Sequence, residues 1–110
     1  MKILILGAGQ VGSTLAKYLC SDDDNDITIV DQKEEMLTPL QRHLDIKTVI
    51  GYGAYPSVLE KAGIKSMDVV IAVMRSDERN MVACRMAHTL YNVKKKIARI
   101  RTTEYLLRPE

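Results

Sequence analysis

The feature that most constrains the fold is a glycine-rich hexad near the start of the chain. Residues 7–12 read Gly-Ala-Gly-Gln-Val-Gly, which fits the pattern G-x-G-x-x-G, and they directly follow the apolar run 2–6. In a strand–turn–helix unit the first glycine permits a tight turn, the second lets the backbone approach a pyrophosphate, and the third lets helix and strand pack closely. The amides and positive dipole end of the following helix attract phosphate groups. The hexad therefore predicts a phosphate-binding turn.

An acidic residue at a suitable distance strengthens this prediction. Asp31 lies 19 residues after Gly12, at the end of a second strand-like run over residues 26–31. A carboxylate at this place accepts hydrogen bonds from the ribose hydroxyls of adenosine and repels a 2′-phosphate. It therefore favours NAD, ADP or ATP over NADP. The alternative is that Asp31 only caps the helix that follows.

Strand-like and helix-like segments alternate along the whole chain. Short apolar runs rich in β-branched residues are typical of strands buried on both faces, and apolar residues three or four apart are typical of helices that cover a sheet. The pattern predicts strands over 2–6, 26–31, 46–50, 67–74 and 96–101, and helices over 11–21, 33–43, 56–62 and 76–92. Pro39 must lie inside the second helix or break it in two. The alternation predicts a doubly wound parallel sheet of the Rossmann type, with about five strands and helices on both faces.

Length and composition are those of one small globular domain. The chain has 110 residues, of which 46% are hydrophobic and 27% charged, and this length suits one domain rather than two. Its apolar runs, such as 69–74, are far shorter than the ~20 residues that cross a bilayer, and no secretory signal precedes the first strand. The net charge of +2 is too small to indicate nucleic acid. We therefore expect a cytosolic domain that does not bind nucleic acid.

Several runs of the sequence are similar to those of one family. They are Met1–Gly12, Asp26–Asp31, Ala62-Gly63, Ile71–Val73, the Ser-Asp-Glu-x-Asn-Met run that opens residues 76–84, and Ile-Ala-Arg-Ile-Arg at 97–101. On these runs the chain resembles the nucleotide-binding domain of the regulator-of-potassium-conductance family, and in particular its Trk potassium-uptake regulatory subunits. The similarity covers essentially the whole chain. It implies one Rossmann-type domain over residues 1–110 that is part of a longer subunit, because the family's full subunit also carries a ligand-binding C-terminal domain.

The resemblance also implies a function, cofactors and partners. Members of the family are peripheral cytosolic subunits that bind NAD(H), and in related members ATP or ADP. Nucleotide occupancy adjusts a membrane potassium channel or transporter, and the subunits usually assemble as dimers and rings. We therefore expect a regulatory subunit that acts at the cytoplasmic face of the inner membrane and catalyses no reaction.

Matching positions give the candidate nucleotide contacts that the resemblance implies. They are Gly7, Ala8, Gly9, Gln10, Val11, Gly12, Asp31, Met74, Arg75 and Arg99. The hexad would contact phosphate and Asp31 the ribose, although the residue pattern itself predicts that the Val11 side chain packs against the sheet. Ligands of such sheets bind outside the carboxyl ends of the strands at the switch point, so Arg75 and Arg99 are expected to border that crevice. Each arginine has the alternative of being an ordinary surface residue.

Two features of the sequence leave alternatives open. The run Ser76-Asp77-Glu78 predicts a capped helix start with favourable first-turn charges, and the alternative for its two carboxylates is a contact with nucleotide or a neighbouring subunit. Tyr52 stands where the family has a short polar residue. Its ring either stacks near adenine or is a partly exposed tyrosine of the turn.

No residues have the spacing of a catalytic or metal site. We expect Cys20 and Cys84 to be reduced, buried, small apolar side chains and His43 and His88 to be structural.

The alternative function is the cofactor-binding half of an NAD-dependent dehydrogenase, which needs a proton donor or base and a second substrate pocket. A scaffold of about 110 residues leaves no room for either. A nucleotide-binding interaction domain unrelated to potassium is a third reading, because one fold hosts many functions.

Overall fold

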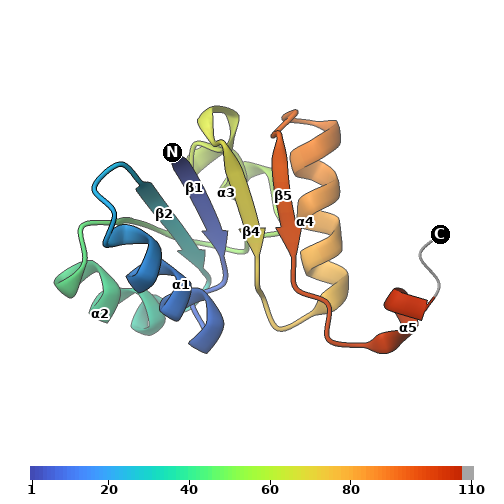
Figure 1. The fold of residues 1–110 in the computed structure, drawn as a ribbon, viewed down its shortest axis with the longest axis horizontal. Helices are drawn as coiled ribbons and strands as arrows, with labels where there is room; N and C mark the ends of the chain where they lie inside the picture. Colours follow the sequence, from blue (N-terminus) through green and yellow to red (C-terminus); the bar gives the residue numbers. More distant parts are fainter. Residues whose placement is uncertain (108–110) are drawn as a thin grey trace.

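The protein is built on one parallel sheet of five strands. The computed structural model describes the backbone of residues 1–107 and the side chains of residues 1–105, so residues 108–110 of the predicted domain lie outside it. The strands are β1 (Lys2–Leu6), β2 (Asp26–Asp31), β3 (Lys47–Ile50), β4 (Val69–Ala72) and β5 (Lys95–Ala98). Their order in space is β3-β2-β1-β4-β5, and all pairs are parallel (Figure 1). The predicted doubly wound sheet is confirmed.

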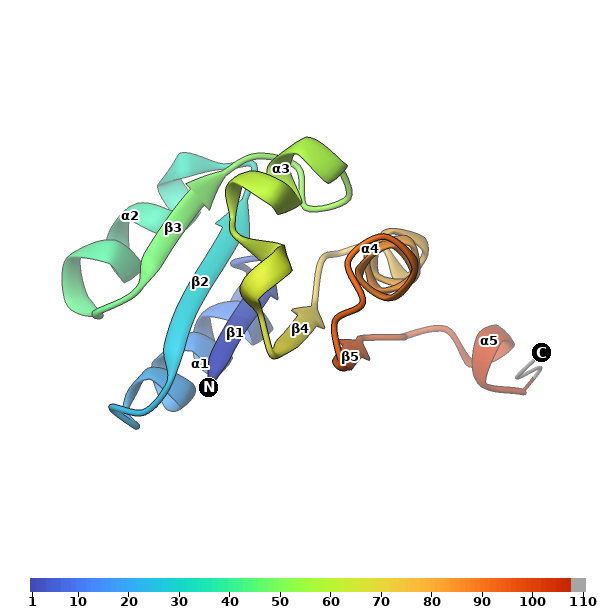
Figure 2. The ribbon, with the colours of Figure 1, turned by 90° about the horizontal axis from the view of Figure 1, so that it is seen from above.

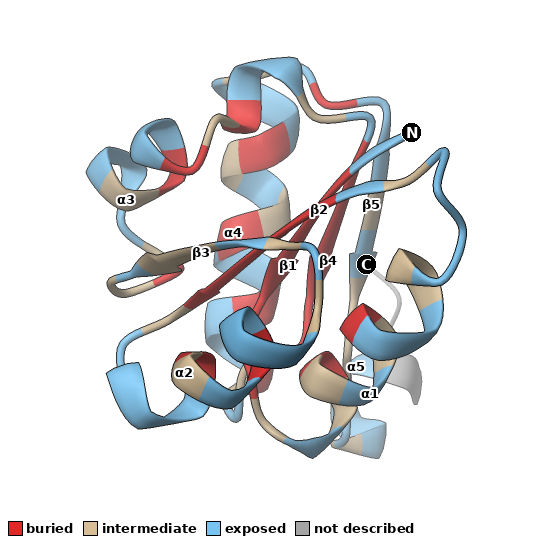
Figure 3. Ribbon diagram, turned by 90° about the vertical axis from the view of Figure 1, so that its left-hand side faces the viewer, coloured by how far each residue is buried: buried red, intermediate tan, exposed pale blue. Residues whose placement is uncertain are grey.

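Helices cover both faces of this sheet (Figure 3). One face carries α1 (Gln10–Cys20) and α2 (Glu34–His43). The other carries α3 (Pro56–Lys61), the 3₁₀ helix η1 (Ile64–Ser66) and α4 (Asp77–Thr89). Among the described helices, none has both the length and the apolar character that crossing a bilayer requires.

Each face of the sheet has its own hydrophobic core. In β1, Ile5 packs toward α1 and α2, whereas its neighbours Leu4 and Leu6 pack toward α3 and α4. All three side chains are fully buried, because successive residues of a strand point to opposite faces. The central strands are therefore buried on both faces, as their continuous apolar runs predict.

Some element ends differ from those predicted from the sequence. β4 and β5 end two and three residues earlier than expected, and residues 73–74 and 99–101 instead form loops at the carboxyl edge. α2 continues through Pro39 as one helix. The core explains this, since Leu37 and Leu40 on either side of the proline are buried in it, and their burial offsets the hydrogen bond that proline cannot make.

A short helix that the sequence did not predict, α5 (Thr103–Leu107), follows β5. It lies beyond the edge of the sheet, as both Figure 1 and Figure 2 show. Tyr105 attaches it to the first turn of α4, because its hydroxyl donates to Glu78 Oε2 at 2.7 Å. Within residues 1–107, no helix therefore covers β5 on the α1/α2 face, where Ile97 is 55% exposed although its register partner Ile71 is 7% exposed.

Candidate functional site

The glycine hexad forms the turn between β1 and α1 at the carboxyl edge of the sheet. Gly7 has a φ of +111°, and a Cβ there would lie 2.8 Å from the Val73 carbonyl oxygen. A Cβ on Gly12 would overlap the Gly7 carbonyl oxygen, so α1 packs directly against the turn. At Gly9, in contrast, no atom lies within 4 Å of the Cβ position. The turn is thus closed toward the protein and open at Gly9.

The first turn of α1 carries neither a side-chain cap nor a negative charge of its own. Its N-cap residue is Gly9, no side chain caps its first amides, and its first turn contains no acidic residue. Gln10 is exposed, and Val11 is half-buried against the core of the α1/α2 face. The packing predicted for Val11 is confirmed. The N-terminal end of α1, with its uncapped amides, suits an anion.

Asp31 joins the end of β2 to the glycine turn. Its Oδ2 accepts a hydrogen bond from the Ala8 amide at 2.8 Å, and its Oδ1 accepts one from the Lys33 amide at 2.9 Å. Lys33 is the N-cap residue of α2, so the carboxylate supports the start of that helix and also holds the turn. Each oxygen keeps a second lone pair, which a ribose hydroxyl could use.

A buried asparagine holds the loops that follow β4 and β5. Asn80 of α4 is fully buried, and its Oδ1 accepts the Met74 amide at 2.7 Å. Its Nδ2 donates to the carbonyl oxygens of Met74 at 3.1 Å and Arg99 at 3.0 Å. The sequence motifs indicate no role for Asn80, although it shares one helix face with the buried residues Ala83 and Ala87. A polar residue within an apolar helix face is the sequence signal that could have indicated the role of Asn80.

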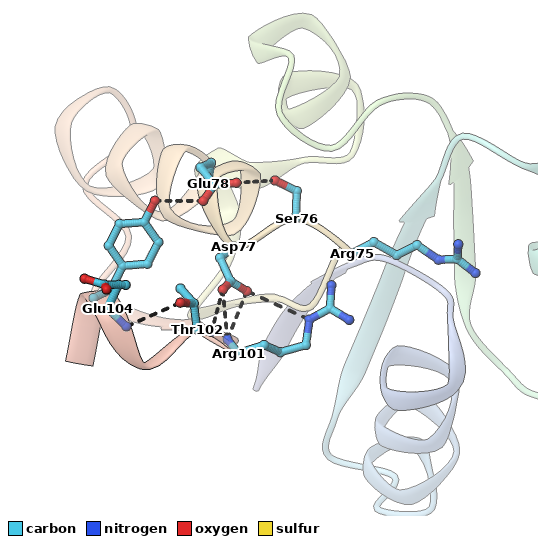
Figure 4. A pocket seen from close by; sticks show the side chains of 8 residues that line it. Arg75, Ser76, Asp77, Glu78, Arg101, Thr102 and Glu104 are labelled. Carbon is cyan, nitrogen blue, oxygen red and sulfur yellow. Dashed lines mark hydrogen bonds and ion pairs between the residues drawn. The ribbon is translucent and has the colours of Figure 1, made fainter. Parts of the chain in front are cut away.

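The candidate residues of the carboxyl edge lie on both sides of the turn. Met74 adjoins it, because a Cβ on Gly7 would lie 3.1 Å from the Met74 amide nitrogen. Asn80 ties Arg99 to Met74, while Asp31 contacts the turn from β2. Arg75 is exposed, and Figure 4 shows its side chain directed away from Asp77.

Asp77 anchors the segment that follows β5. Both of its carboxylate oxygens accept the Arg101 amide at 3.0 Å, and Oδ2 also accepts the Thr102 amide at 2.9 Å. These backbone hydrogen bonds, with a smaller contribution from the Arg101 and Arg99 charges, hold the pKa of Asp77 below its usual value. Ser76 caps the same helix by accepting the Arg79 amide at 3.3 Å. The predicted capped start of α4 is confirmed, and Asp77 has a long-range role besides.

An open hollow of about 470 Å³ lies beside this anchor (Figure 4). Glu78 faces it, and the Tyr105 hydroxyl that donates to Glu78 is the main reason why the pKa of this carboxyl group is lowered. The other lining residues are Arg75, Ser76, Asp77, Arg101, Thr102 and Glu104. Arg75 is thus a lining residue that also belongs to the candidate nucleotide contacts, and the glycine turn and Asp31 lie elsewhere along the edge.

Tyr52 packs against α4 through its ring. The Arg79 guanidinium lies 4.7 Å from the ring centroid, and the Tyr55 ring meets it edge-on at 4.8 Å. The side chain is half-buried. This arrangement fits the partly exposed tyrosine of the turn, one of the two alternatives left open by the sequence. Within the described residues, no group of three or more His, Cys, Asp or Glu side chains has the arrangement of a metal site.

Comparison with known proteins assigns the family. Residues 3–108 match the model of the TrkA-N domain. The chain belongs to the TrkA-N domain family. It is 55% identical over 108 residues to the Trk system potassium uptake protein TrkA of Halomonas elongata, a match that covers 98% of the chain and 23% of that relative. The chain thus spans about a quarter of the length of this curated relative.

Solved structures support the same fold for this TrkA-N chain. The TrkA-N domain of the inner membrane protein ybaL from Escherichia coli superposes with a TM-score of 0.86 at 18% identity, covering 96% of this chain and 77% of that one. The Kef CTD of Shewanella denitrificans, in its AMP-bound form, superposes with a TM-score of 0.79 at 23% identity, covering 96% and 65%. These likenesses establish the Rossmann-type fold of the TrkA-N chain.

Proposed function

We propose that this TrkA-N chain is a nucleotide-binding regulatory domain of a potassium-uptake system. The observation that carries the proposal is the glycine turn, which is closed by backbone contacts at Gly7 and Gly12 and open at Gly9. The uncapped start of α1 lies directly behind that opening. A diphosphate placed there would meet free amides and the positive end of a helix dipole, as in other phosphate sites of this type.

The working ligand in this proposal is NAD(H), with ATP or ADP as the related choice. Asp31 would accept a hydrogen bond from the adenosine ribose, since it lies beside the turn with lone pairs to spare. The rest of the ligand would extend over Met74 toward Arg75 and Arg99. Asn80 holds the backbone at two of these positions, so the loops that border the ligand are rigidly placed.

The regulatory part of the proposal is supported by the relatives. The relative from Halomonas elongata is named as a potassium uptake protein, and a regulator needs binding and a conformational preference rather than chemistry. We propose that the domain belongs to a longer, self-associating subunit, peripheral to the cytoplasmic face of the membrane, that controls a potassium channel or transporter. The dehydrogenase alternative would require an acid or base and a substrate pocket beside the cofactor.

The binding step is tested best with Gly9→Ala. The backbone of Gly9 has a φ of −72° and open space at the Cβ position, so alanine fits the free protein and should leave its stability equal or higher by about 0.4–1 kcal/mol. The same methyl group would occupy the place where the pyrophosphate approaches the backbone. We expect calorimetry to give at least a tenfold weaker affinity for NADH, ADP and ATP.

A control separates this effect from a general one. Thr14→Ala changes an exposed position of the same helix and should leave nucleotide affinity unchanged. Nucleotide binding that is equal in the wild type and Gly9→Ala would contradict the proposed site, and no binding of any adenine nucleotide by the wild type would contradict the proposed function. Regulation is then tested by grafting residues 1–108 into the Halomonas elongata relative and measuring potassium uptake with and without Gly9→Ala. Both grafted proteins should restore potassium uptake. Uptake should respond to nucleotide with the wild-type graft and should not respond with the Gly9→Ala graft.

A further inference from the structure

A second hollow lies at the opposite edge of the sheet, where β1, β2 and β3 begin. It measures about 240 Å³ and lies between these strand ends and the α3–η1 segment, with Lys2, Asp26, Thr28, Lys47, Lys61 and Ser66 among its lining residues. In Figure 1 the strand arrows run from this edge toward the glycine turn. The two sites therefore lie at opposite ends of the strands and share no residue.

The register of the sheet explains why these side chains gather. Lys2 pairs with Asp26 and Thr28 pairs with Lys47. All four stand on the α3/α4 face, because Lys2 alternates with Leu4, Thr28 with Val30, and Lys47 with Val49, which pack into the core of that face. Lys61 joins them from the last turn of α3.

The charge of this hollow is positive and unpaired. Three lysines and one aspartate line it, which gives a formal charge of 3 − 1 = +2. Lys2, Lys47 and Lys61 form no ion pair with any carboxylate of the described residues. Closely grouped like charges repel each other, and an anion between them would relieve that repulsion.

Thr28 supplies an independent observation. Thr28 is 5% exposed, yet its hydroxyl makes no hydrogen bond to any described residue. No fully enclosed side-chain nitrogen or oxygen of the described residues lacks a partner, so this hydroxyl must be reached from the hollow that Thr28 lines. Buried polar groups are normally paired, and a valine of the same shape would satisfy the packing. The hydroxyl is therefore placed to bond something in the hollow.

We propose that this hollow binds a phosphate-type dianion, as inorganic phosphate or the phosphomonoester group of a larger molecule. The charge of +2 matches that anion, and the Thr28 hydroxyl donates a hydrogen bond to one of its oxygens. Pockets for small organic ligands usually measure about 300–1,000 Å³, so a hollow of about 240 Å³ suits one anionic group rather than a whole dinucleotide. The site is independent of the proposed nucleotide function.

The test uses the Gly9→Ala chain, in which binding of phosphate groups at the glycine turn is weakened. Inorganic phosphate is titrated at constant ionic strength and followed by calorimetry and by the amide NMR signals of Thr28, Lys47 and Gly63. We expect saturable shifts at these amides. Thr28→Val keeps the shape of the side chain and should weaken phosphate binding about tenfold, as expected for one hydrogen bond to a charged group.

Charge variants complete the test. Lys47→Gln and Lys61→Gln should each weaken binding several-fold, and the effect should be larger at low salt. The matched control is Lys65→Gln, which removes the same charge from an exposed residue of η1 and should change the affinity less than twofold. Equal losses in all three lysine variants, or no loss with Thr28→Val, would overturn the proposal, as would unmoved amides at millimolar phosphate.

A second arm distinguishes the source of the anion. Co-sedimentation with vesicles of phosphatidic acid in phosphatidylcholine is compared with titration of free phosphate. Vesicle binding that accompanies phosphate binding and is weakened by Thr28→Val assigns a lipid headgroup, and phosphate binding without vesicle binding assigns a soluble phosphate compound. Either result supports the site. Binding of vesicles but not of phosphate, unchanged in Thr28→Val, would contradict it.

Discussion

Helices α1 and α4 both begin at the carboxyl edge, after the neighbouring strands β1 and β4, but their first turns are opposite in character. α1 begins at Gly9 without a side-chain cap and without an acidic residue. α4 begins with a serine cap and two carboxylates in its first turn. The positive end of α4 is thus filled by its own side chains, while that of α1 is left open. The difference indicates where along one edge an anionic ligand has room.

The loops beside these helices differ in the same way. Beyond β4 and β5, Asn80 and Asp77 pair backbone groups at positions 74, 99, 101 and 102. Beyond β1, Asp31 accepts the Ala8 amide and Ser13 donates to the Gly9 carbonyl at 2.7 Å, but among the described residues no side chain accepts from the first amides of α1. One half of the edge is therefore stabilised by internal hydrogen bonds, and the other half is arranged for a ligand. Substitutions in the first half should mainly change stability, and those in the second half should mainly change affinity.

The largest effect is expected for Asn80→Ala. The change removes three hydrogen bonds from a fully buried side chain and leaves a buried amide and carbonyl groups without partners. Its cost in the free energy of unfolding should be about 3 kcal/mol or more, measured by urea denaturation. Asn25→Ala is the control, because Asn25 makes one side-chain bond, to the Leu19 carbonyl at 3.0 Å, and its loss should cost about 1 kcal/mol. Equal losses of unfolding free energy in the two variants would show that the Asn80 hydrogen bonds do not specially stabilise the loops beyond β4 and β5.

A smaller effect, in affinity as well as stability, is expected for Asp31→Asn, because asparagine can accept only one of the two backbone amides that Asp31 accepts. The variant removes the charge that would hold the ribose and repel a 2′-phosphate. Affinity for NADH should fall about tenfold, which corresponds to about 1.4 kcal/mol, and the preference for NAD over NADP should shrink. Calorimetry with both dinucleotides measures this. If the ratio of NAD affinity to NADP affinity is the same in the variant and the wild type, Asp31 does not contact the ribose as proposed.

The smallest effect is a pH dependence at Asp77. Its pKa is lowered in the folded protein by the Arg101 and Thr102 amides, so its contribution to stability is present above the unfolded pKa of about 3.9 and is lost as the pH falls through the lower folded value. The difference in melting temperature between the wild type and Asp77→Asn should therefore be larger at pH 7 than near pH 3. Hydrogen exchange at the two amides should show the same trend. A difference that does not change with pH would contradict this role.

The sequence predicts the local parts of the site better than its long-range parts. The five strands and the turn between β1 and α1 are confirmed because their signals lie in a few consecutive residues: Gly7 and Gly12, where no Cβ fits, and apolar runs buried on both faces. The roles of Asn80 and Asp77 were missed because their partners, Arg99, Arg101 and Thr102, are 19 to 25 residues away. A helix-start pattern correctly predicts the serine cap, but it cannot indicate that the next carboxylate holds a loop from another strand.

The hollow at the amino edge was beyond sequence reasoning for a related reason. Lys2, Thr28, Lys47 and Lys61 come from four different elements, and only the register of the sheet and the packing of α3 beside it bring them together. The strand ends were also predicted too long, because residues 99–101 continue an apolar and basic pattern, whereas the Arg99 carbonyl and the Arg101 amide bond to Asn80 and Asp77 of α4.

The bonding of Asn80 also limits which amino acids position 80 can accept. Its side chain offers one acceptor and two donor hydrogens in a single plane, and both heavy atoms are used. Ionised aspartate has no donor and serine has only one, histidine has the wrong shape, and glutamine places the same amide one methylene farther from the backbone. A library of all twenty residues at this position, selected for folded protein, should therefore return asparagine almost alone.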